Sequence, residues 1–140
     1  MAEIANRYGN QDLLITQEVS DRMGDIVSRS DKDPKPFPRQ VDAWWLGIGI
    51  GLKLGIRTPL PDKTVKFNDG GILSSDPWRI THLEALALAE EGETALQNPA
   101  QVIRIASEYA NTGLKWLVEQ TLGEAEPTLR LMNTIGELTQ

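Results

Sequence analysis

Residues 41–55, VDAWWLGIGIGLKLG, contain four glycines in an otherwise largely apolar run. A dinucleotide-binding loop needs G-x-G-x-x-G between a strand and a helix, whereas Gly47, Gly49 and Gly51 give G-x-G-x-G. No G-K-[ST] sequence of the Walker type is present. The uncharged run spans ten residues, half of the roughly 20 that cross a membrane. The segment is therefore predicted to be a helix of the protein core.

Glycine recurs at every fourth position along this helix, at Gly47, Gly51 and Gly55, which gives the helix a smooth face. Each interior glycine costs roughly 0.5–1 kcal/mol relative to alanine, so close packing against another helix has to offset that cost. We predict a central core helix that begins near Pro38 and packs through this glycine row. Gly55 can instead be the residue that ends the helix.

Two adjacent tryptophans, Trp44 and Trp45, precede the glycine row. Successive side chains of a helix point about 100° apart, so one ring is expected to anchor the core and the other to lie at an interface. These two residues and the glycine row are the predicted packing or partner interface. The alternative is that both rings, together with Trp116, belong to the core.

The remaining sequence predicts a mainly α fold with a small β element, in a single helical domain of about four to five helices. β-favouring residues predict a strand at about residues 13–18, and apolar spacing predicts an amphipathic helix from Val19 to Val27. The chain would then begin with a strand-helix-helix order. Asp76-Pro77 and Asn98-Pro99 each predict a helix start, with Asp76 as N-cap.

The second of these helices is expected to be the longest, unless residues 111–113 break it. A short strand is expected at residues 64–67, in a hairpin or ordered loop. Apolar residues at helical spacing also recur in the C-terminal segment, at Leu129, Met132, Ile135 and Leu138. The expected organisation is a flexible N-terminus over residues 1–12 and one globular domain over 13–140, with an exposed loop over 30–37 and a connecting loop over 56–76.

Composition excludes several chemistries. The chain has no cysteine, which rules out disulfides, thiolate zinc sites and cysteine nucleophiles and suits a reducing compartment. No export signal is recognisable at the N-terminus, so we expect a cytoplasmic protein with no membrane association. His82 is the only histidine, and it is expected, with Glu84, to flank a helix face. No catalytic residue, cofactor or metal ligand can be named from these patterns.

A small metal-dependent nuclease is a remote alternative. Carboxylates can hold Mg²⁺ beside a basic residue. The chain offers such residues after its glycine-rich segment, but at a spacing that matches no nuclease motif: Asp62, Asp69 and Asp76, with Lys63 and Lys66.

Charge is unevenly distributed along the chain. Residues 22–66 hold nine Lys or Arg against five Asp, a net charge of +4, whereas the whole chain carries −6. The middle third is therefore the candidate surface for a polyanion, although such charges commonly only solvate loops and helix faces. The candidate phosphate contacts are Arg29, Lys32, Lys35, Arg39, Lys53 and Arg57.

The strand, helix, loop and helix expected over residues 13–55 resemble ribbon-helix-helix proteins, which dimerise through their strands and place that ribbon in the DNA major groove. The exposed face of the strand would carry Leu14, Thr16 and Glu18. A carboxylate at this place repels phosphate, where that family often presents Lys or Arg. This carboxylate therefore argues against DNA reading by the strand, although the order of elements fits the family. A dimeric DNA-binding regulator of this type is the alternative function.

A second resemblance covers more of the chain. The segment FPRQVDAWWLGIGIGLKLGIRTPL, followed some fifty residues later by ASEYANTGLKWL, resembles small accessory proteins encoded with bacterial DNA phosphorothioation (Dnd) systems. That family combines an Asp-led apolar helix, a glycine-rich Arg-Pro segment and a helix bearing Tyr-Ala-Asn-x-Gly. The matching residues here are Asp42, Gly51, Gly55, Arg57 and Pro59, then Tyr109, Ala110, Asn111, Gly113 and Leu114.

This resemblance implies a non-catalytic accessory or adaptor protein in DNA phosphorothioation and the restriction and phage defence coupled to it. The implied partners are other protein subunits of the modification or restriction assembly. Duplex DNA is a further candidate partner, contacted weakly by the protein alone. A homodimer is one open alternative for the oligomeric state.

Overall fold

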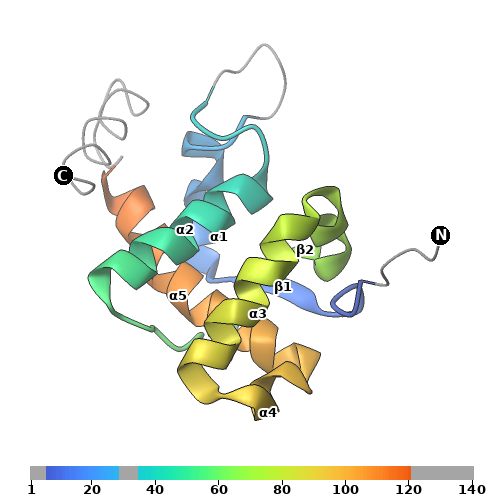
Figure 1. Cartoon of the computed structure of the whole chain (residues 1–140). Helices are drawn as coiled ribbons and strands as arrows, with labels where there is room; N and C mark the ends of the chain where they lie inside the picture. Colours follow the sequence, from blue (N-terminus) through green and yellow to red (C-terminus); the bar gives the residue numbers. More distant parts are fainter. Residues whose placement is uncertain (1–5, 29–34, 121–140) are drawn as a thin grey trace.

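The computed structural model describes residues 6–28 and 35–120, and within them the chain is mainly helical with one two-stranded sheet (Figure 1). The predicted fold class is thus confirmed. The strands are β1 (Asp12–Ile15) and β2 (Val65–Asp69), and two 3₁₀ turns cover Met23–Asp25 and Gly70–Ser75. The α-helices are α1 (Gln17–Arg22), α2 (Gln40–Leu54), α3 (Pro77–Glu91), α4 (Glu93–Leu96) and α5 (Pro99–Gln120).

The centre of the molecule is the crossing of α2 over α5, which is the most extensive contact between elements (Figure 1). A Cβ atom at Gly51 would lie 2.2 Å from the carbonyl oxygen of Tyr109. A Cβ atom at Gly113 would lie 1.8 Å from the carbonyl oxygen of Gly47. Both distances are far below van der Waals contact, so glycine is required on both helices for their backbones to touch.

The other two glycines of α2 have different surroundings. Gly55 does not join the glycine contact, because nothing lies within 4 Å of its Cβ position. It adopts φ 73° and its N–H donates to the carbonyl of Gly51, so it ends the helix in the left-handed conformation that glycine favours. Gly49 is exposed, and its Cβ position is also open.

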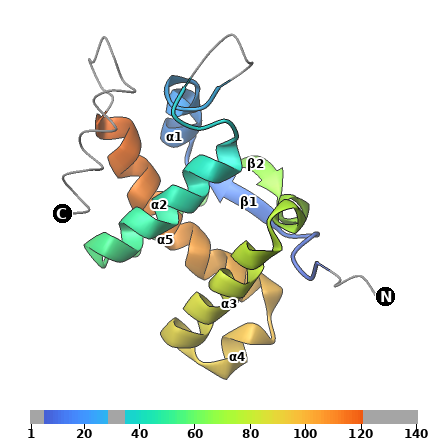
Figure 2. The ribbon, with the colours of Figure 1, turned by 45° about the horizontal axis from the view of Figure 1, so that its top comes forward.

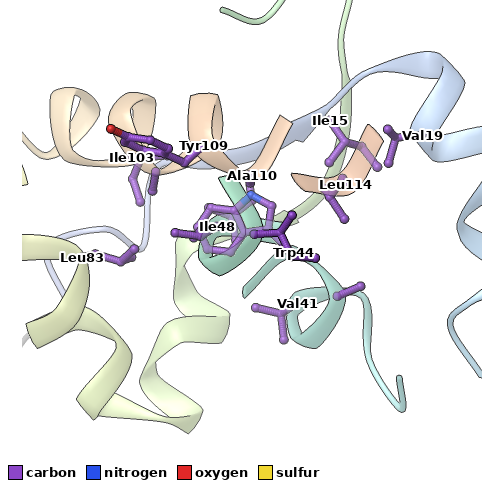
Figure 3. Packing of buried hydrophobic residues seen from close by; sticks show 14 of the residues in the cluster. Ile15, Val19, Val41, Trp44, Ile48, Leu83, Ile103, Tyr109, Ala110 and Leu114 are labelled. Carbon is purple, nitrogen blue, oxygen red and sulfur yellow. The ribbon is translucent and has the colours of Figure 1, made fainter. Parts of the chain in front are cut away.

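Trp44 is the aromatic anchor of the core. Its side chain is fully buried, and Figure 3 shows it between Ile48 of the same helix and Leu114 of α5. The ring of Phe67 from β2 lies 6.2 Å away, centroid to centroid. Trp45, on the neighbouring face of α2, is only partly buried. The two tryptophans therefore have the different environments expected of adjacent helical residues.

The sheet joins two distant parts of the chain. β1 and β2 are antiparallel, with Ile15 opposite Val65 and Leu13 opposite Asn68. A bulge interrupts this register beside Phe67, the ring that packs against Trp44. The expected strands at 13–18 and 64–67 are present with shifted bounds. The prediction that residues 56–76 form a local hairpin is wrong, because β2 pairs with the N-terminal strand β1.

β1 ends earlier than expected because Thr16 caps the next helix. Its hydroxyl accepts a hydrogen bond from the N–H of Val19 at 3.2 Å. The amphipathic helix expected over residues 19–27 is α1 followed by a 3₁₀ turn.

The two predicted helix starts are confirmed, because Pro77 is the first residue of α3 and Pro99 is the first residue of α5. Asp76 precedes α3, but its side chain makes no capping bond because it accepts from Arg39 instead. Asp76 is thus the N-cap residue of α3, as predicted, without a side-chain capping bond. α5 runs unbroken through residues 111–113.

The predicted flexible N-terminus is wrong for residues 6–12. Tyr8 is fully buried and its hydroxyl donates to Glu84 of α3 at 2.9 Å, which ties this segment to the helices. The predicted loop 30–37 is described only from residue 35, and Phe37 is bridged there to Val27. The C-terminal apolar pattern from Leu129 onward lies outside the described residues.

The glycine crossing yields a direct stability test. Gly51→Ala should lower the free energy of unfolding by about 1–3 kcal/mol, because the added methyl group forces the two backbones apart. Gly49→Ala is the matched control on the same helix and should stabilise by about 0.5–1 kcal/mol, because it gains helix propensity in open space. Urea unfolding followed by circular dichroism gives both values. Equal stability of the two variants would contradict the close contact.

Candidate functional site

Helices α2 and α3 run side by side in the same direction across α5 (Figure 2). They make few backbone contacts with each other, although each packs on α5. Side-chain contacts connect them near both ends, from Asp42 to Arg79 at the beginning and from Arg57, just after α2, to Glu91 at the end. Between these two connections the helices are separated by an open groove.

This α2–α3 groove has a volume of about 170 Å³. Its floor is formed by residues that also belong to the core, and its walls are the facing sides of the two helices. Among these lining residues there is no Asp, Glu, Lys or Arg. They are Trp45, Ile48, Gly49, Leu52, His82, Leu83 and Leu86.

Three aromatic rings gather at the N-terminal end of the groove. Trp45 lies 5.4 Å from Trp78 and 6.2 Å from His82, measured between ring centroids, and Trp78 lies 5.8 Å from His82. All three pairs meet edge to face, a favoured arrangement for aromatic side chains. Trp78 nevertheless remains 50% exposed. The rings of this aromatic end thus pack against one another, and Trp78 also remains open to solvent.

Arg79 supports the aromatic end from within. Its guanidinium carbon lies 5.3 Å from the ring centroid of Trp45 and 5.2 Å from that of Trp78. The residue is only 8% exposed, and its Nη2 donates to Asp42 Oδ1 at 3.0 Å. Its Nε atom is buried without a hydrogen-bond partner. The cation therefore makes cation–π contacts with both tryptophans.

An ion-pair network surrounds Arg79. Arg39 donates to Asp42 at 2.9 and 3.1 Å and to Asp76 at 3.0 Å, so two cations meet two carboxylates. Burial alone would raise the pKa of Asp42, but the hydrogen bonds from Arg39 and Arg79 outweigh burial and hold that pKa below its usual value. Bonding to Asp42 and Asp76 raises the pKa of Arg39. Both shifts favour the charged forms of Asp42 and Arg39.

A second polar cluster closes the other end of the groove. Arg57 donates to Glu108 of α5 at 2.6 and 3.0 Å and to Glu91 of α3 at 3.2 Å. Burial lowers the pKa of Arg57, but its hydrogen bonds to Glu108 and Glu91 prevail and raise it. Arg104 also approaches Glu91 and Glu108, at 3.6 and 3.8 Å.

The segment after α2 docks on α5 beside this cluster. The Asn111 side chain donates to the carbonyls of Thr58 and Pro59 at 3.0 and 3.3 Å, and the hydroxyls of Thr58 and Thr112 are 2.6 Å apart. The backbone carbonyl of Glu108 accepts a hydrogen bond from the backbone N–H of Thr58 at 3.1 Å. Residues 56–59 and 108–113 therefore form one packed unit.

Of the candidate phosphate contacts that the structure describes, Arg39 precedes α2, Lys53 lies in its last turn and Arg57 follows it. Arg39 and Arg57 are engaged by carboxylates of this chain, as described above. Lys53 is exposed at the end of α2, and the backbone N–H of Lys35 donates to Ser28 Oγ at 2.9 Å. Arg29 and Lys32 lie outside the described residues.

The candidate metal-binding carboxylates are not brought together. Among residues 6–28 and 35–120, no three His, Asp or Glu side chains form a cluster that could hold a metal ion. Asp69 accepts from the N–H of Gly71, and Asp76 accepts from Arg39. In the same part of the chain no helix is long and apolar enough to cross a bilayer.

The sequence interpretation did not include Trp78 and Arg79, although both belong to the aromatic end of this site. A signal for Arg79 was present in its spacing. Arg79, Leu83 and Ala87 recur every fourth residue and all three are buried, so a basic residue occupies the apolar row of α3. A charge at such a position indicates a partner of opposite sign elsewhere in the fold. Nothing in the sequence identified that partner as Asp42.

Comparison of the chain with protein-family models, with curated proteins and with solved structures gives no match.

The Arg79–Asp42 contact can be tested by Asp42→Asn. The change keeps the shape but removes the carboxylate that Arg79 bonds at 3.0 Å and leaves this buried cation only Asp76, 3.9 Å away, so the free energy of unfolding should fall by about 1.5–3 kcal/mol at neutral pH. Because the pKa of Asp42 is lowered by folding, its contribution is present above about pH 4 and is lost as the pH falls through the folded-state pKa. The variant should therefore differ less from the wild type in acid than at pH 7.

The measurement is urea unfolding of both proteins across this pH range. Asp62→Asn is the matched control, because Asp62 is exposed and outside the network. Equal midpoints for the two variants at neutral pH would contradict a stabilising role for Asp42.

Proposed function

We propose that this chain is a non-catalytic accessory protein of a bacterial DNA phosphorothioation system and of the restriction and phage defence coupled to it. It acts in the cytoplasm by forming complexes with other protein subunits. The observation that carries the proposal is the apolar surface on and beside α2 and α3. The large hydrophobic residues that are exposed in the described part of the chain all lie there: Leu52, Leu54, Ile56, Trp78 and Leu88.

Such a surface is expected of a protein that works by contact. Isolated exposed apolar residues are common, but exposed apolar residues on the two helices that border an open apolar groove favour an interaction site. Trp78 is half exposed and already fixed by Trp45, His82 and Arg79, so little side-chain entropy is lost when a partner covers it. Tryptophan is also enriched among the residues that contribute most to binding.

The kind of assembly is inferred from the resemblance to phosphorothioation accessory proteins. Support comes from the way the two resembling segments pack. Gly51 of the first touches Tyr109 of the second, Arg57 bonds the neighbouring Glu108, and Asn111 bonds the carbonyl of Pro59. The residues that carry the resemblance thus belong to one structural unit, and Asp42 extends it to the groove through Arg79.

The charge distribution supports a role in which other subunits bind the DNA. Arg39 and Arg57, two of the candidate phosphate contacts, are held by carboxylates of the same chain. The chain as a whole carries −6, which repels a polyanion.

Co-purification tests the proposal directly. A tagged copy expressed with its genomic neighbours should retain modification or restriction subunits, and Trp78→Ala should reduce that retention because the exposed anchor is lost. Trp116→Ala is unsuitable as a control because its ring packs on the core, whereas Lys115→Ala on exposed α5 surface is suitable. Circular dichroism and the urea midpoint confirm that each variant is folded.

Deletion of the gene gives the second arm of this experiment. Loss of phosphorothioate linkages from genomic DNA, or of phage resistance, is the expected result. Recovery of the tagged protein alone, with modification and phage resistance intact in the deletion strain, would remove the proposed function.

Duplex binding by the isolated protein distinguishes the proposal from a ribbon-helix-helix regulator. We expect a dissociation constant in the non-specific range of about 10⁻⁴–10⁻⁶ M at physiological salt. Filter binding to duplexes of different sequence, between about 50 and 200 mM salt, provides the measurement. Tight and sequence-selective binding would favour the regulator instead.

A further inference from the structure

We propose that the α2–α3 groove receives one large apolar side chain from an amphipathic helix of another subunit, and that a basic residue of the same helix lies over Glu90 and Glu93. The proposal rests on the proposed function, because it names the kind of segment through which a partner subunit binds this face. Three features of the groove support such a helix: the spacing of its lining residues, its volume, and the charge at the end where α2 and α3 terminate.

The wall that α2 contributes has the spacing of a helix-packing hole. Its four residues lie at i, i+3, i+4 and i+7: Trp45, Ile48, Gly49 and Leu52. In knobs-into-holes packing, four residues of one helix form the hole that receives a single side chain, the knob, of the facing helix. Gly49 adds no side chain to this hole, and no atom from another part of the described chain lies within 4 Å of its Cβ position. An extended peptide would instead need the edge of a sheet for its main-chain bonds, which two helices do not offer.

The size of the groove fits one knob. Its volume is about 170 Å³, and a cavity of about 150 Å³ lined by Leu, Ile and Phe side chains holds a benzene molecule. A Leu or Phe side chain is of this size. His82, Leu83 and Leu86 of α3 form the opposite wall, so the knob has aliphatic or aromatic groups on both sides. The half-exposed Trp78 at the aromatic end is placed to cover the flank of the entering helix.

The charges at the two ends of the groove differ. At the aromatic end two arginines pair with two aspartates: Arg39 and Arg79 with Asp42 and Asp76. At the other end two arginines pair with two glutamates: Arg57 and Arg104 with Glu91 and Glu108. Two further carboxylates, Glu90 and Glu93, are exposed beside this second cluster and take no part in its ion pairs.

Glu90 belongs to the groove face of α3. It follows the lining residues Leu83 and Leu86 at i+7 and i+4, and it accepts a hydrogen bond from the hydroxyl of Tyr109. Lys53, exposed in the last turn of α2, offsets one of the two additional carboxylates. This end of the groove therefore has one more carboxylate than cations, and it attracts a basic residue of the entering helix.

The direction of that helix follows from the directions of α2 and α3. Both run the same way, so their C-termini, at Leu54 and Glu91, lie at the end of the groove that carries Glu90 (Figure 2). A helix C-terminus has a partial negative charge and a helix N-terminus a partial positive one, so an antiparallel helix is favoured. Glu90 lies about 9 Å along the helix axis beyond the middle of the α3 wall. The basic residue of the partner thus precedes its apolar knob by about two turns.

The test uses the subunit that the tagged protein retains when it is expressed with its genomic neighbours. Gly49→Leu fills the hole, so the dissociation constant for this purified subunit should rise about thirtyfold or more by calorimetry. Leucine favours a helix more than glycine does and enters open space, so the urea midpoint should be no lower than that of the wild type. Lys115→Leu is the matched control, because it adds the same residue on exposed α5 surface, and it should bind like the wild type.

Neutralising the acidic end tests the charge contact. Glu90→Gln combined with Glu93→Gln keeps an acceptor for the Tyr109 hydroxyl, and the dissociation constant should rise about two- to fivefold. Its dependence on salt should also weaken. Asp62→Asn, at an exposed carboxylate outside the groove, is the control. Affinity and salt dependence equal to those of the wild type would overturn the basic residue over Glu90 and Glu93.

The binding segment of the partner can be identified by crosslinking. Because the chain has no cysteine, Ala85→Cys gives a single attachment site for a photoreactive maleimide. Ala85 is exposed and directly precedes the lining residue Leu86. Mass spectrometry should locate the crosslink in a segment with apolar residues at helical spacing and with Lys or Arg about two turns before a Leu or Phe. A crosslinked segment without this pattern, or unchanged affinity of Gly49→Leu, would overturn the proposal.

These results distinguish the helix in the groove from the proposed function. Retention of modification or restriction subunits that Trp78→Ala weakens and Gly49→Leu does not would refute the helix and leave the accessory role standing. A crosslinked helix of the expected pattern, from a protein outside the modification and restriction system, would support the helix and refute the accessory role. Recovery of the tagged protein alone would refute both.

Discussion

The contact on which the structure depends is the backbone crossing of α2 and α5. Two residues of α2, Gly47 and Gly51, touch the backbone or side chains of α5 around Tyr109 and Gly113, at distances that leave no room for a Cβ atom at Gly51 or Gly113. The backbones of the two helices are thereby brought together at two points, Gly51 with Tyr109 and Gly47 with Gly113. The glycines lower the helix propensity of α2, and the close packing of the two helices offsets that cost.

The crossing also determines what remains open. Helix α3 rests on α5 as well, beside α2 (Figure 2). The two helices meet through charged groups near their ends, while their middle parts stay apart and leave an apolar groove. Trp78 is presented at this groove by packed rings and by the buried cation of Arg79. The proposed interface is thus a consequence of how tightly the core is packed beneath it.

Local signals in the sequence predicted part of this arrangement. The spacing of Gly47 and Gly51 predicted a close helix contact, and Pro77 and Pro99 predicted two helix starts, because these features depend on residues near one another in the chain. The pairing of β1 with β2 and the bonding of Arg79 to Asp42 could not be predicted. Each joins segments far apart in the sequence, and many partners of equal chemistry were available to each.

Native-state hydrogen exchange tests the central role of the crossing most directly. The slowest amides should be those of α2 and α5 around Gly51 and Gly113, exchanging only through global unfolding, since opening them requires separation of the two backbones. Amides on the exposed side of α3, near Ala85, should exchange faster through local opening. If the α5 amides near Gly113 exchanged as fast as those near Ala85, the crossing would not be the contact that holds the fold together.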